Sequence, residues 1–135
     1  MASLDTTILV DLLRRRRELR RRALDKLDDL HARNESLVTT RFNLAELYLG
    51  AELSQDPSAE YGDIATLTGR IKILEFDDIA ARLFAEMTAH LRRIGRPAGD
   101  MDVLIAATAL AAGHCLVTRN PAHFADIPGV AVETY

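Results

Sequence analysis

Short β-prone segments alternate with longer amphipathic segments along this chain, and that alternation limits its possible folds more than any other feature. The predicted strands are residues 2–5, 37–39, 71–74, 115–118 and 130–132. Between most of them, apolar residues recur at the three- and four-residue spacing of a helix face. Strands that alternate with helices predict an α/β domain with three layers, in which helices cover both faces of a mainly parallel sheet of four to five short strands. The chain has 135 residues, so we expect one domain over 1–135.

Helix boundaries are marked by capping residues and glycines. The predicted helices are 6–31, 41–53, 58–69, 78–94 and 100–112. Thr40 is suited to cap the second of these helices, and Pro57 to the first turn of the third. In the helix over 41–53, an apolar stripe is expected to pack in the core; its members are Phe42, Ala45, Leu49 and Leu53, flanked by Leu44 and Leu47.

The composition is that of an ordinary globular protein, and it excludes several functional classes. The hydrophobic fraction is 48%, the charged fraction is 27% and the net charge is −3, so a polyanion must be bound by a local basic patch or through a metal. The single cysteine, Cys115, excludes an intramolecular disulfide and a Cys-rich zinc site, and it fits a reducing, cytoplasmic location. No apolar run reaches the ~18 residues of a membrane span and no signal peptide is visible, so we expect no membrane association.

Four acidic residues occur where predicted strands end or helices begin: Asp5, Glu46, Asp100 and Asp102. Ligands of parallel sheets bind at the carboxyl ends of the strands, and these positions can share one edge of the sheet. Like charges at about 4 Å repel by roughly 4 kcal/mol at an effective dielectric near 20, so convergent carboxylates require a cation or a shared proton. Oxygen ligands without His or Cys suit Mg²⁺ or Mn²⁺. The acids therefore predict a metal site if they converge.

Four short motifs follow one another along the chain. They are Leu4-Asp5-Thr6-Thr7-Ile8-Leu9-Val10-Asp11, Asn43-Leu44-Ala45-Glu46-Leu47, Asp102-Val103-Leu104-Ile105-Ala106-Ala107-Thr108-Ala109, and Leu116-Val117-Thr118-Arg119-Asn120 with His123-Phe124. In order and spacing they resemble the PIN-domain endoribonucleases, and among these the toxin subunits of VapBC-type (type II) toxin–antitoxin pairs. The resemblance implies a metal-dependent nuclease that cleaves structured RNA such as tRNA or rRNA. It also implies a homodimer that forms a larger complex with a small inhibitory protein, the cognate antitoxin.

The same resemblance assigns catalysis and metal binding to Asp5, Glu46 and Asp102. These acids are expected to hold Mg²⁺ or Mn²⁺, whose bound water hydrolyses an RNA phosphodiester bond. Asn120 takes a fourth position that is often Asp in the wider family, so the number of metal ions stays open.

Three further residues near these acids receive auxiliary roles. Thr6 and Thr118 are expected to orient the carboxylates or a ligated water. Asp100 is expected to be an N-cap, with an indirect role at the metal as the alternative, because residues i and i+2 do not share a helix face.

Basic residues supply candidate phosphate contacts. Arg14–Arg17 and Arg20–Arg22 place seven cations within nine positions of one predicted helix. Of these, Arg14, Arg15 and Arg17 are candidates for RNA binding, while a solvated face or a partner-binding face is the alternative. Arg119 either contacts the scissile phosphate or lies on the surface, and His123 is expected to pack or to cap a turn.

A second function stays open at this stage. A PIN-like interaction module could dimerise and bind a partner or RNA without turnover, because Asn120 supplies no full negative charge to a metal site.

Overall fold

Twelve elements make up the computed structural model, which describes residues 1–135. In chain order they are β1 (Ala2–Leu4), α1 (Thr6–Leu13), α2 (Arg17–Ala32), β2 (Leu37–Thr40), α3 (Arg41–Glu52), α4 (Pro57–Thr68), β3 (Lys72–Leu74), α5 (Asp78–Arg93), α6 (Asp100–Ala111), β4 (Cys115–Val117), the 3₁₀ turn η1 (Pro121–Phe124) and β5 (Val132–Glu133). The five strands form one sheet in the order β3-β2-β1-β4-β5, and every neighbouring pair is parallel. The predicted α/β class is thus confirmed, although the last strand begins two residues later than expected.

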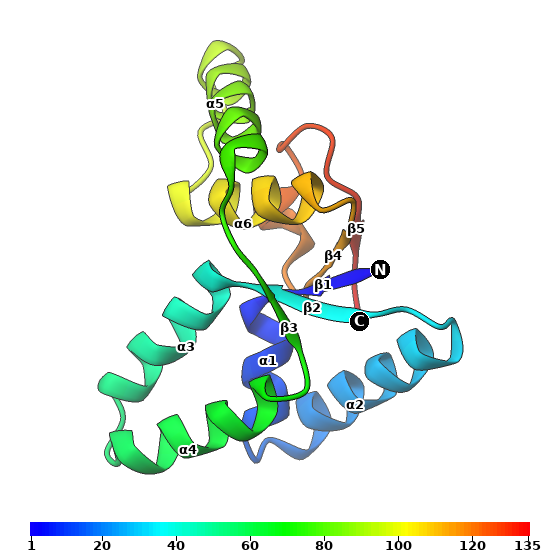
Figure 1. Cartoon of the computed structure of the whole chain (residues 1–135), viewed down its shortest axis with the longest axis vertical. Coiled ribbons are helices and arrows are strands. Elements are labelled where there is room, and N and C mark those ends of the chain that lie inside the picture. The colour runs from blue at the N-terminus through cyan, green and yellow to red at the C-terminus, as the bar shows by residue number, and fades with distance from the viewer.

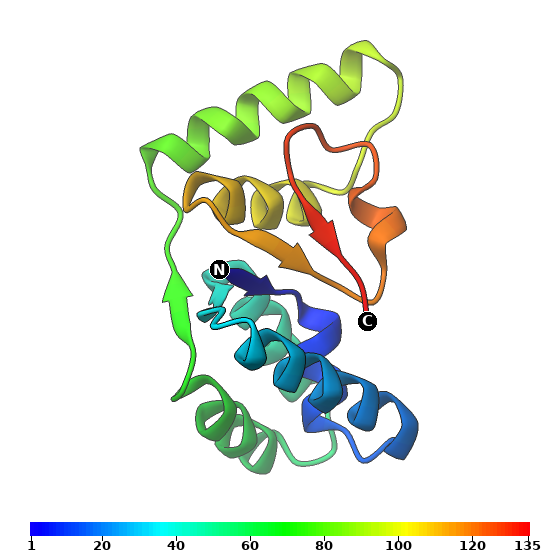
Figure 2. The ribbon, with the colours of Figure 1, turned by 90° about the vertical axis from the view of Figure 1, so that its right-hand side faces the viewer.

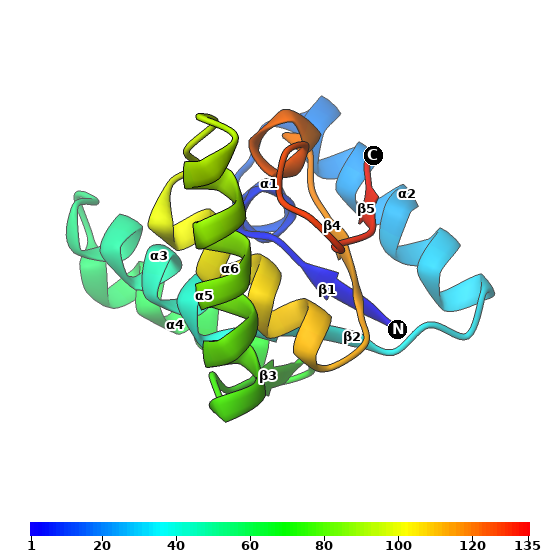
Figure 3. The ribbon, with the colours of Figure 1, turned by 90° about the horizontal axis from the view of Figure 1, so that it is seen from above.

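Helices cover both faces of this sheet. Figures 1 and 2 show α1–α4 on one side of the strands and α5 with α6 on the other. Seen from above, α3 with α4 and α2 lie at opposite ends of the molecule (Figure 3). Each face has its own apolar core, and the adjacent residues Leu116 and Val117 of β4 belong to opposite cores, as the period-two geometry of a strand requires.

The helix predicted over 6–31 is wrong, because the chain leaves helical geometry at the arginine run. Arg14 and Arg16 both have extended backbone angles, and α1 and α2 lie on either side of them. Arg14–Arg17 are exposed. A continuous helix would place Arg14 and Arg17, and likewise Arg16 and Arg20, one turn apart, where like charges repel.

The apolar stripe predicted for α3 is also wrong. The buried residues of this helix are Asn43, Leu44, Leu47 and Ala51, whereas Leu49 and Leu53 are 60% and 79% exposed. The N-cap prediction at Thr40 is confirmed: its hydroxyl accepts from the Asn43 backbone N–H, and the Asn43 side chain accepts from the Thr40 N–H in return. The face of α3 that is buried thus carries Leu44, Leu47 and Ala51 together with the polar Asn43.

Helices α5 and α6 end where the sequence predicts. Gly95 and Gly113 have φ values of 69° and 75°, a left-handed geometry that strongly favours glycine. At the start of α6 the prediction of an Asp100 N-cap is wrong: Gly99 is the N-cap, and Asp100 is the first helical residue, without a capping hydrogen bond.

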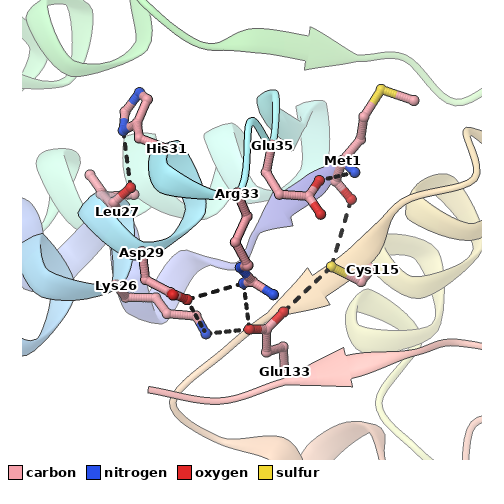
Figure 4. A network of polar contacts seen from close by, with 9 residues as sticks. All are labelled: Met1, Lys26, Leu27, Asp29, His31, Arg33, Glu35, Cys115 and Glu133. Carbon is pink, nitrogen blue, oxygen red and sulfur yellow. Dashed lines mark hydrogen bonds and ion pairs between the residues drawn. The ribbon is translucent and has the colours of Figure 1, made fainter.

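A polar network fastens β5 to α2 and to the start of the chain (Figure 4). The Glu133 carboxylate accepts from Lys26 and from Arg33, and both cations also face Asp29. These donors hold the pKa of Glu133 below its ordinary value. The Met1 ammonium group pairs with Glu35 beside this network. These contacts connect the edge strand β5 to the layer of α1–α4.

No helix in the structure is both long and apolar enough to cross a membrane.

Candidate active site

The carboxyl ends of β1 and β4 open into an acidic cleft. Both strands are adjacent in the sheet, and Asp5 and Thr118 directly follow them. The cleft has a volume of about 230 Å³. It is lined by Asp5, Thr6, Thr7, Val10, Glu46, Asp102, Arg119, Asn120 and His123. The topology therefore brings together the three acids predicted for the site, from β1, α3 and α6.

Asp5 is the most enclosed of these acids, with 6% of its surface exposed. Its Oδ1 accepts from Asn43 Nδ2 at 3.1 Å, and its Oδ2 accepts from the Thr118 hydroxyl at 2.8 Å. The Thr7 hydroxyl lies 3.5 Å from the same Oδ2. A buried carboxylate is stable only when hydrogen bonds replace its water, and these donors do so while fixing its orientation.

Asn43 links Asp5 to the rest of the cleft. Its Oδ1 accepts from the Thr40 hydroxyl at 2.7 Å, so its Nδ2 is left to donate to Asp5 and, at 3.0 Å, to the Thr6 hydroxyl. Thr6 in turn donates to Glu46 Oε1 at 2.6 Å. Asn43 is fully buried, so the cap of α3 and the orientation of two catalytic candidates depend on one amide.

Glu46 and Asp102 are disfavoured as anions in this cleft. Burial raises the pKa of Glu46; the Thr6 hydrogen bond works against that rise, and the charges of Asp5 and Asp102 add to it. Burial likewise raises the pKa of Asp102; His123 opposes that shift and Asp5 adds to it. Both carboxylates would gain from a nearby cation.

The donor set fits a hard divalent cation. It consists of carboxylate, hydroxyl and amide oxygens, and these are the ligands that Mg²⁺ and Mn²⁺ prefer. The side chains line one cleft without forming a ready-made cluster, since no group of three His, Cys, Asp or Glu residues lies close enough to hold one ion. Proteins commonly bind Mg²⁺ through one or two carboxylates and retained waters, so direct contact by all three acids is not required.

Arg119 is the one lysine or arginine that lines the cleft. Its Nε donates to Asp11 Oδ2 at 2.9 Å, and its Nη2 lies 3.4 Å from Asp11 Oδ1. The Tyr135 hydroxyl donates to the same carboxylate at 2.7 Å. The hydrogen bond to Asp11 raises the pKa of Arg119 further, so the guanidinium is charged at every relevant pH.

The other predicted residues lie in different places. Asn120 lines the cleft, whereas Asp100 is exposed and does not. Arg14, Arg15 and Arg17 are exposed outside the cleft.

His123 neither packs nor caps a turn as expected. Its side chain is 60% exposed, and its Nδ1 lies 3.6 Å from Asp102 Oδ2.

Sequence reasoning missed four residues that shape the site. They are Thr7, Asp11, Asn43 and Tyr135. Asp11 and Asn43 stand inside the motifs and carry polar groups among apolar neighbours, which was the available signal. Nothing local in the sequence marks Tyr135, because its contact with Asp11 joins residues 124 positions apart.

A second, more apolar groove adjoins the acidic cleft and shares Val10 and Glu46 with it. Its volume is about 350 Å³, and its other lining residues are Leu13, Arg14, Leu47, Gly50, Ala51, Leu53, Ser54, Glu60 and Ile64, from α1, α3 and α4. Next to it, Tyr48 and Leu49 of α3 and Tyr61 of α4 expose apolar surface, and the rings of Tyr48 and Tyr61 lie 5.1 Å apart.

Comparison with known proteins identifies the family. The PIN domain matches residues 2–130. The tRNA(fMet)-specific endonuclease VapC of Shigella flexneri is 37% identical over 92 residues, which are 68% of this chain and 70% of that protein. Ribonuclease VapC2 of Haemophilus influenzae is 29% identical over 132 residues, or 98% of this chain and 96% of that protein. Among solved structures, the DNA-bound VapBC2 of Rickettsia felis has a TM-score of 0.89 and 26% identity, and the similarity covers 99% of this chain and 98% of the matched chain. DNA-bound VapBC of Salmonella typhimurium has a TM-score of 0.86 and 27% identity, over 98% of this chain and 96% of its own. The chain therefore belongs to the PIN domain family, and within it to the VapC ribonucleases.

Proposed function

We propose that this ribonuclease is the toxin of a type II toxin–antitoxin pair and that its acidic cleft hydrolyses RNA phosphodiester bonds with Mg²⁺ or Mn²⁺. The observation that carries the proposal is the arrangement of Asp5, Glu46 and Asp102 around one cleft at the carboxyl ends of β1 and β4. Three carboxylates from distant segments repel one another, and a divalent cation offsets that repulsion.

The residues of the cleft have distinct parts in this proposal. Asp5, Glu46 and Asp102 would hold the cation. Bound there, a divalent ion acidifies a water and neutralises phosphate charge. Thr6 donates to Glu46 at 2.6 Å and Thr118 donates to Asp5 at 2.8 Å, and these bonds orient the two carboxylates. Asn120 offers an amide at the rim in place of a fourth charge.

The test compares substitutions of two acids that lie two positions apart, Asp102 in the cleft and Asp100 outside it. Purified wild-type, Asp102→Asn and Asp100→Asn proteins are incubated with total RNA and Mg²⁺, and the new 5′ ends are mapped by sequencing. We expect cleavage by the wild type and by Asp100→Asn, since Asp100 lies outside the cleft, and a loss of at least about 100-fold for Asp102→Asn. Cleavage by Asp102→Asn at the wild-type rate would refute the assignment, and so would wild-type cleavage by Asp5→Ala in the same assay.

A non-catalytic interaction module is the weaker alternative. The relatives carry the names ribonuclease and endonuclease, and a module without turnover would not need Asp5 and Glu46, which hydrogen bonds orient at the cleft. The proposed target is structured RNA such as tRNA or rRNA. One relative, which is named as specific for tRNA(fMet), supports this choice.

The groove beside the cleft supports a protein partner. VapBC and FitAcB complexes are among the similar solved structures, and we propose that a cognate antitoxin segment occupies the groove and covers Glu46. Leu53 is 79% exposed at the groove and is suited to contact an apolar partner side chain. Leu53→Glu is expected to weaken inhibition by the antitoxin while leaving the RNA cleavage of the free toxin unchanged.

Self-association and compartment belong to the same proposal. Apolar side chains outside the groove are exposed, among them Ile79 at 60% and Ile94 at 47%, and they support a homodimer within the larger toxin–antitoxin complex. Light scattering of the purified toxin tests this directly. The single cysteine suits work in the reducing cytoplasm.

The arginine run is proposed as an outer RNA contact. Arg15 and Arg17 are exposed at the break between α1 and α2, whereas Arg14 lines the partner groove. If Arg15 and Arg17 each bind one phosphate, Arg15→Gln with Arg17→Gln lowers the salt slope of single-stranded RNA binding by about 1.4. An unchanged slope removes the two residues from the RNA site.

A further inference from the structure

We propose that Asp11 is a positioning residue, which holds the Arg119 guanidinium at the acidic cleft so that Arg119 binds an RNA phosphate there. The inference rests on the proposed function for its substrate class, and it adds a role for a buried acid outside the cleft. Tyr135 supports Asp11 in that role.

The geometry around Asp11 is that of a built holder. The residue lies on α1 and its side chain is 3% exposed. Its Oδ2 accepts from Arg119 Nε at 2.9 Å and from the Tyr135 hydroxyl at 2.7 Å, and its Oδ1 lies 3.4 Å from Arg119 Nη2. Two parallel contacts from one guanidinium to one carboxylate fix the plane of the guanidinium as well as its distance.

The backbone of Arg119 is fixed as well. Its N–H donates to the Thr7 hydroxyl at 3.0 Å, and that hydroxyl lies 3.3 Å from the Thr118 hydroxyl, which binds Asp5. The Arg119 side chain is 34% exposed, and its Nη1 makes no hydrogen bond within the protein. The charged Nη1 donor is therefore left without a partner, while the Arg119 backbone and the Nε and Nη2 side of its guanidinium are both held.

Charge balance explains why a cleft of this kind needs a holder. Asp5, Glu46 and Asp102 repel a polyanion, and Arg119 is the only lysine or arginine among the lining residues. An unrestrained arginine would pair with these acids and neutralise them. In the structure Arg119 pairs with Asp11 instead and forms no ion pair with the three. Asp11 thus keeps the Arg119 guanidinium beside the three acids without letting it pair with them.

A purely structural pair is the competing explanation, in which Asp11 only ties the loop after β4 to α1. The two explanations predict opposite signs for one substitution. Asp11→Asn removes a negative charge near the RNA site, which by itself tightens the binding of a polyanion. If Asp11 positions Arg119, the same substitution weakens RNA binding despite the gain in net charge.

The experiment measures the binding of a fluorescein-labelled single-stranded RNA of mixed sequence in EDTA, where no metal-dependent cleavage occurs. Wild type, Asp11→Asn, Arg119→Gln and the double variant are compared over a range of salt concentrations, with Asp28→Asn, an exposed acid on α2, as the matched charge control. We expect Asp11→Asn and Arg119→Gln each to weaken binding about 3–10-fold, and Arg119→Gln to lower the salt slope by about 0.7. The double variant should bind RNA as Arg119→Gln alone does, because both substitutions act on the same contact between Arg119 and an RNA phosphate. Asp28→Asn should bind as the wild type does or slightly tighter.

Several results would overturn the inference. The first is an Asp11→Asn protein that is folded and binds RNA as tightly as the wild type or tighter. The second is a double variant whose loss of RNA affinity is the sum of the two single losses. The third is a wild type that binds no RNA. Should Asp11→Asn fail to fold, Tyr135→Phe takes its place: it removes only the 2.7 Å hydroxyl bond and should weaken binding in the wild type but not in Arg119→Gln. Binding is read without turnover, so a wild type that binds RNA but never cleaves it would count against the proposed function alone.

Discussion

Glu46→Gln is predicted to stabilise the metal-free protein while abolishing RNA cleavage. Burial raises the pKa of Glu46, and the charges of Asp5 and Asp102, which line the same cleft, add to that rise. A group whose pKa is raised in the folded state is destabilising when ionised, so at neutral pH its neutral isostere favours folding. The glutamine also keeps an oxygen that can accept the 2.6 Å bond from Thr6, so the substitution changes charge more than geometry.

The size of the effect follows from the charges in the cleft. Two like charges cost about 1 kcal/mol at 4 Å in bulk water and about 4 kcal/mol at an effective dielectric of 20. The carboxylates are too far apart to form a ready-made cluster, and at that larger separation in a partly hydrated cleft each pair costs about 0.5–1 kcal/mol. Removing the charge of Glu46 ends two such pairs, which corresponds to about 1–2 kcal/mol. For a domain of this size the thermal midpoint should rise by about 4–8 °C.

Differential scanning calorimetry in EDTA and then in Mg²⁺ provides the measurement. We expect Glu46→Gln to unfold at a higher temperature than the wild type in EDTA, and Mg²⁺ to narrow this gap because the cation stabilises only a folded state that binds it. Glu52→Gln, at the exposed end of the same helix, is the control and should leave the midpoint unchanged. A midpoint for Glu46→Gln at or below that of the wild type in EDTA would show that the acids of the cleft do not strain the fold.

Two further predictions concern residues that the structure connects to this cleft and to the sheet. Asn43→Ala removes donors to Asp5 and Thr6 and half of the α3 capping box, so we expect about 2–3 kcal/mol less stability in urea and a turnover about 100-fold lower; wild-type turnover would refute the role of Asn43. Glu133→Gln breaks the network of Figure 4 and should cost about 1 kcal/mol at pH 7, allowing for partial exposure. The pKa of Glu133 is lowered in the fold, so its contribution is present above the usual glutamate pKa of about 4.3 and lost as the pH falls below it. Urea unfolding at pH 7 and pH 3 checks this, and an equal gap at both values would contradict it.

The sequence predicted the architecture because its signals are local. The strand-like segments that follow turns, the Thr40 cap and the two glycines that end α5 and α6 each act within a few residues, and the parallel order follows from their alternation with helices. The convergence of the three acids could also be predicted, because the carboxyl ends of parallel strands meet at one edge of the sheet.

The errors have two different causes. The continuous helix over 6–31 fails locally, at the arginine run, where like charges one turn apart oppose the good helix propensity of each arginine. The role of Asp11 depends on distant contacts. In the sequence it only interrupts an apolar stretch, and its partners Arg119 and Tyr135 lie 108 and 124 positions away. Charge pairs across more than a hundred residues leave no periodic trace, so periodicity could not find them.

Helix α3 shows how the polar site and the proposed partner surface depend on one another. The face of this helix that packs on the core carries Leu44, Leu47 and Ala51, whereas Leu49 and Leu53 are exposed. The Asn43 amide is buried on the same side, against Asp5 and Thr6, and its hydrogen bonds hold the same rotation. That rotation carries Glu46 into the cleft and leaves Leu53 at the neighbouring groove. The hydrogen bonds that orient the acids thus also help to hold the rotation that leaves Leu53 at the groove. A partner that fills the groove would lie against the same helix face as Glu46 and would reach the site without a conformational change in between.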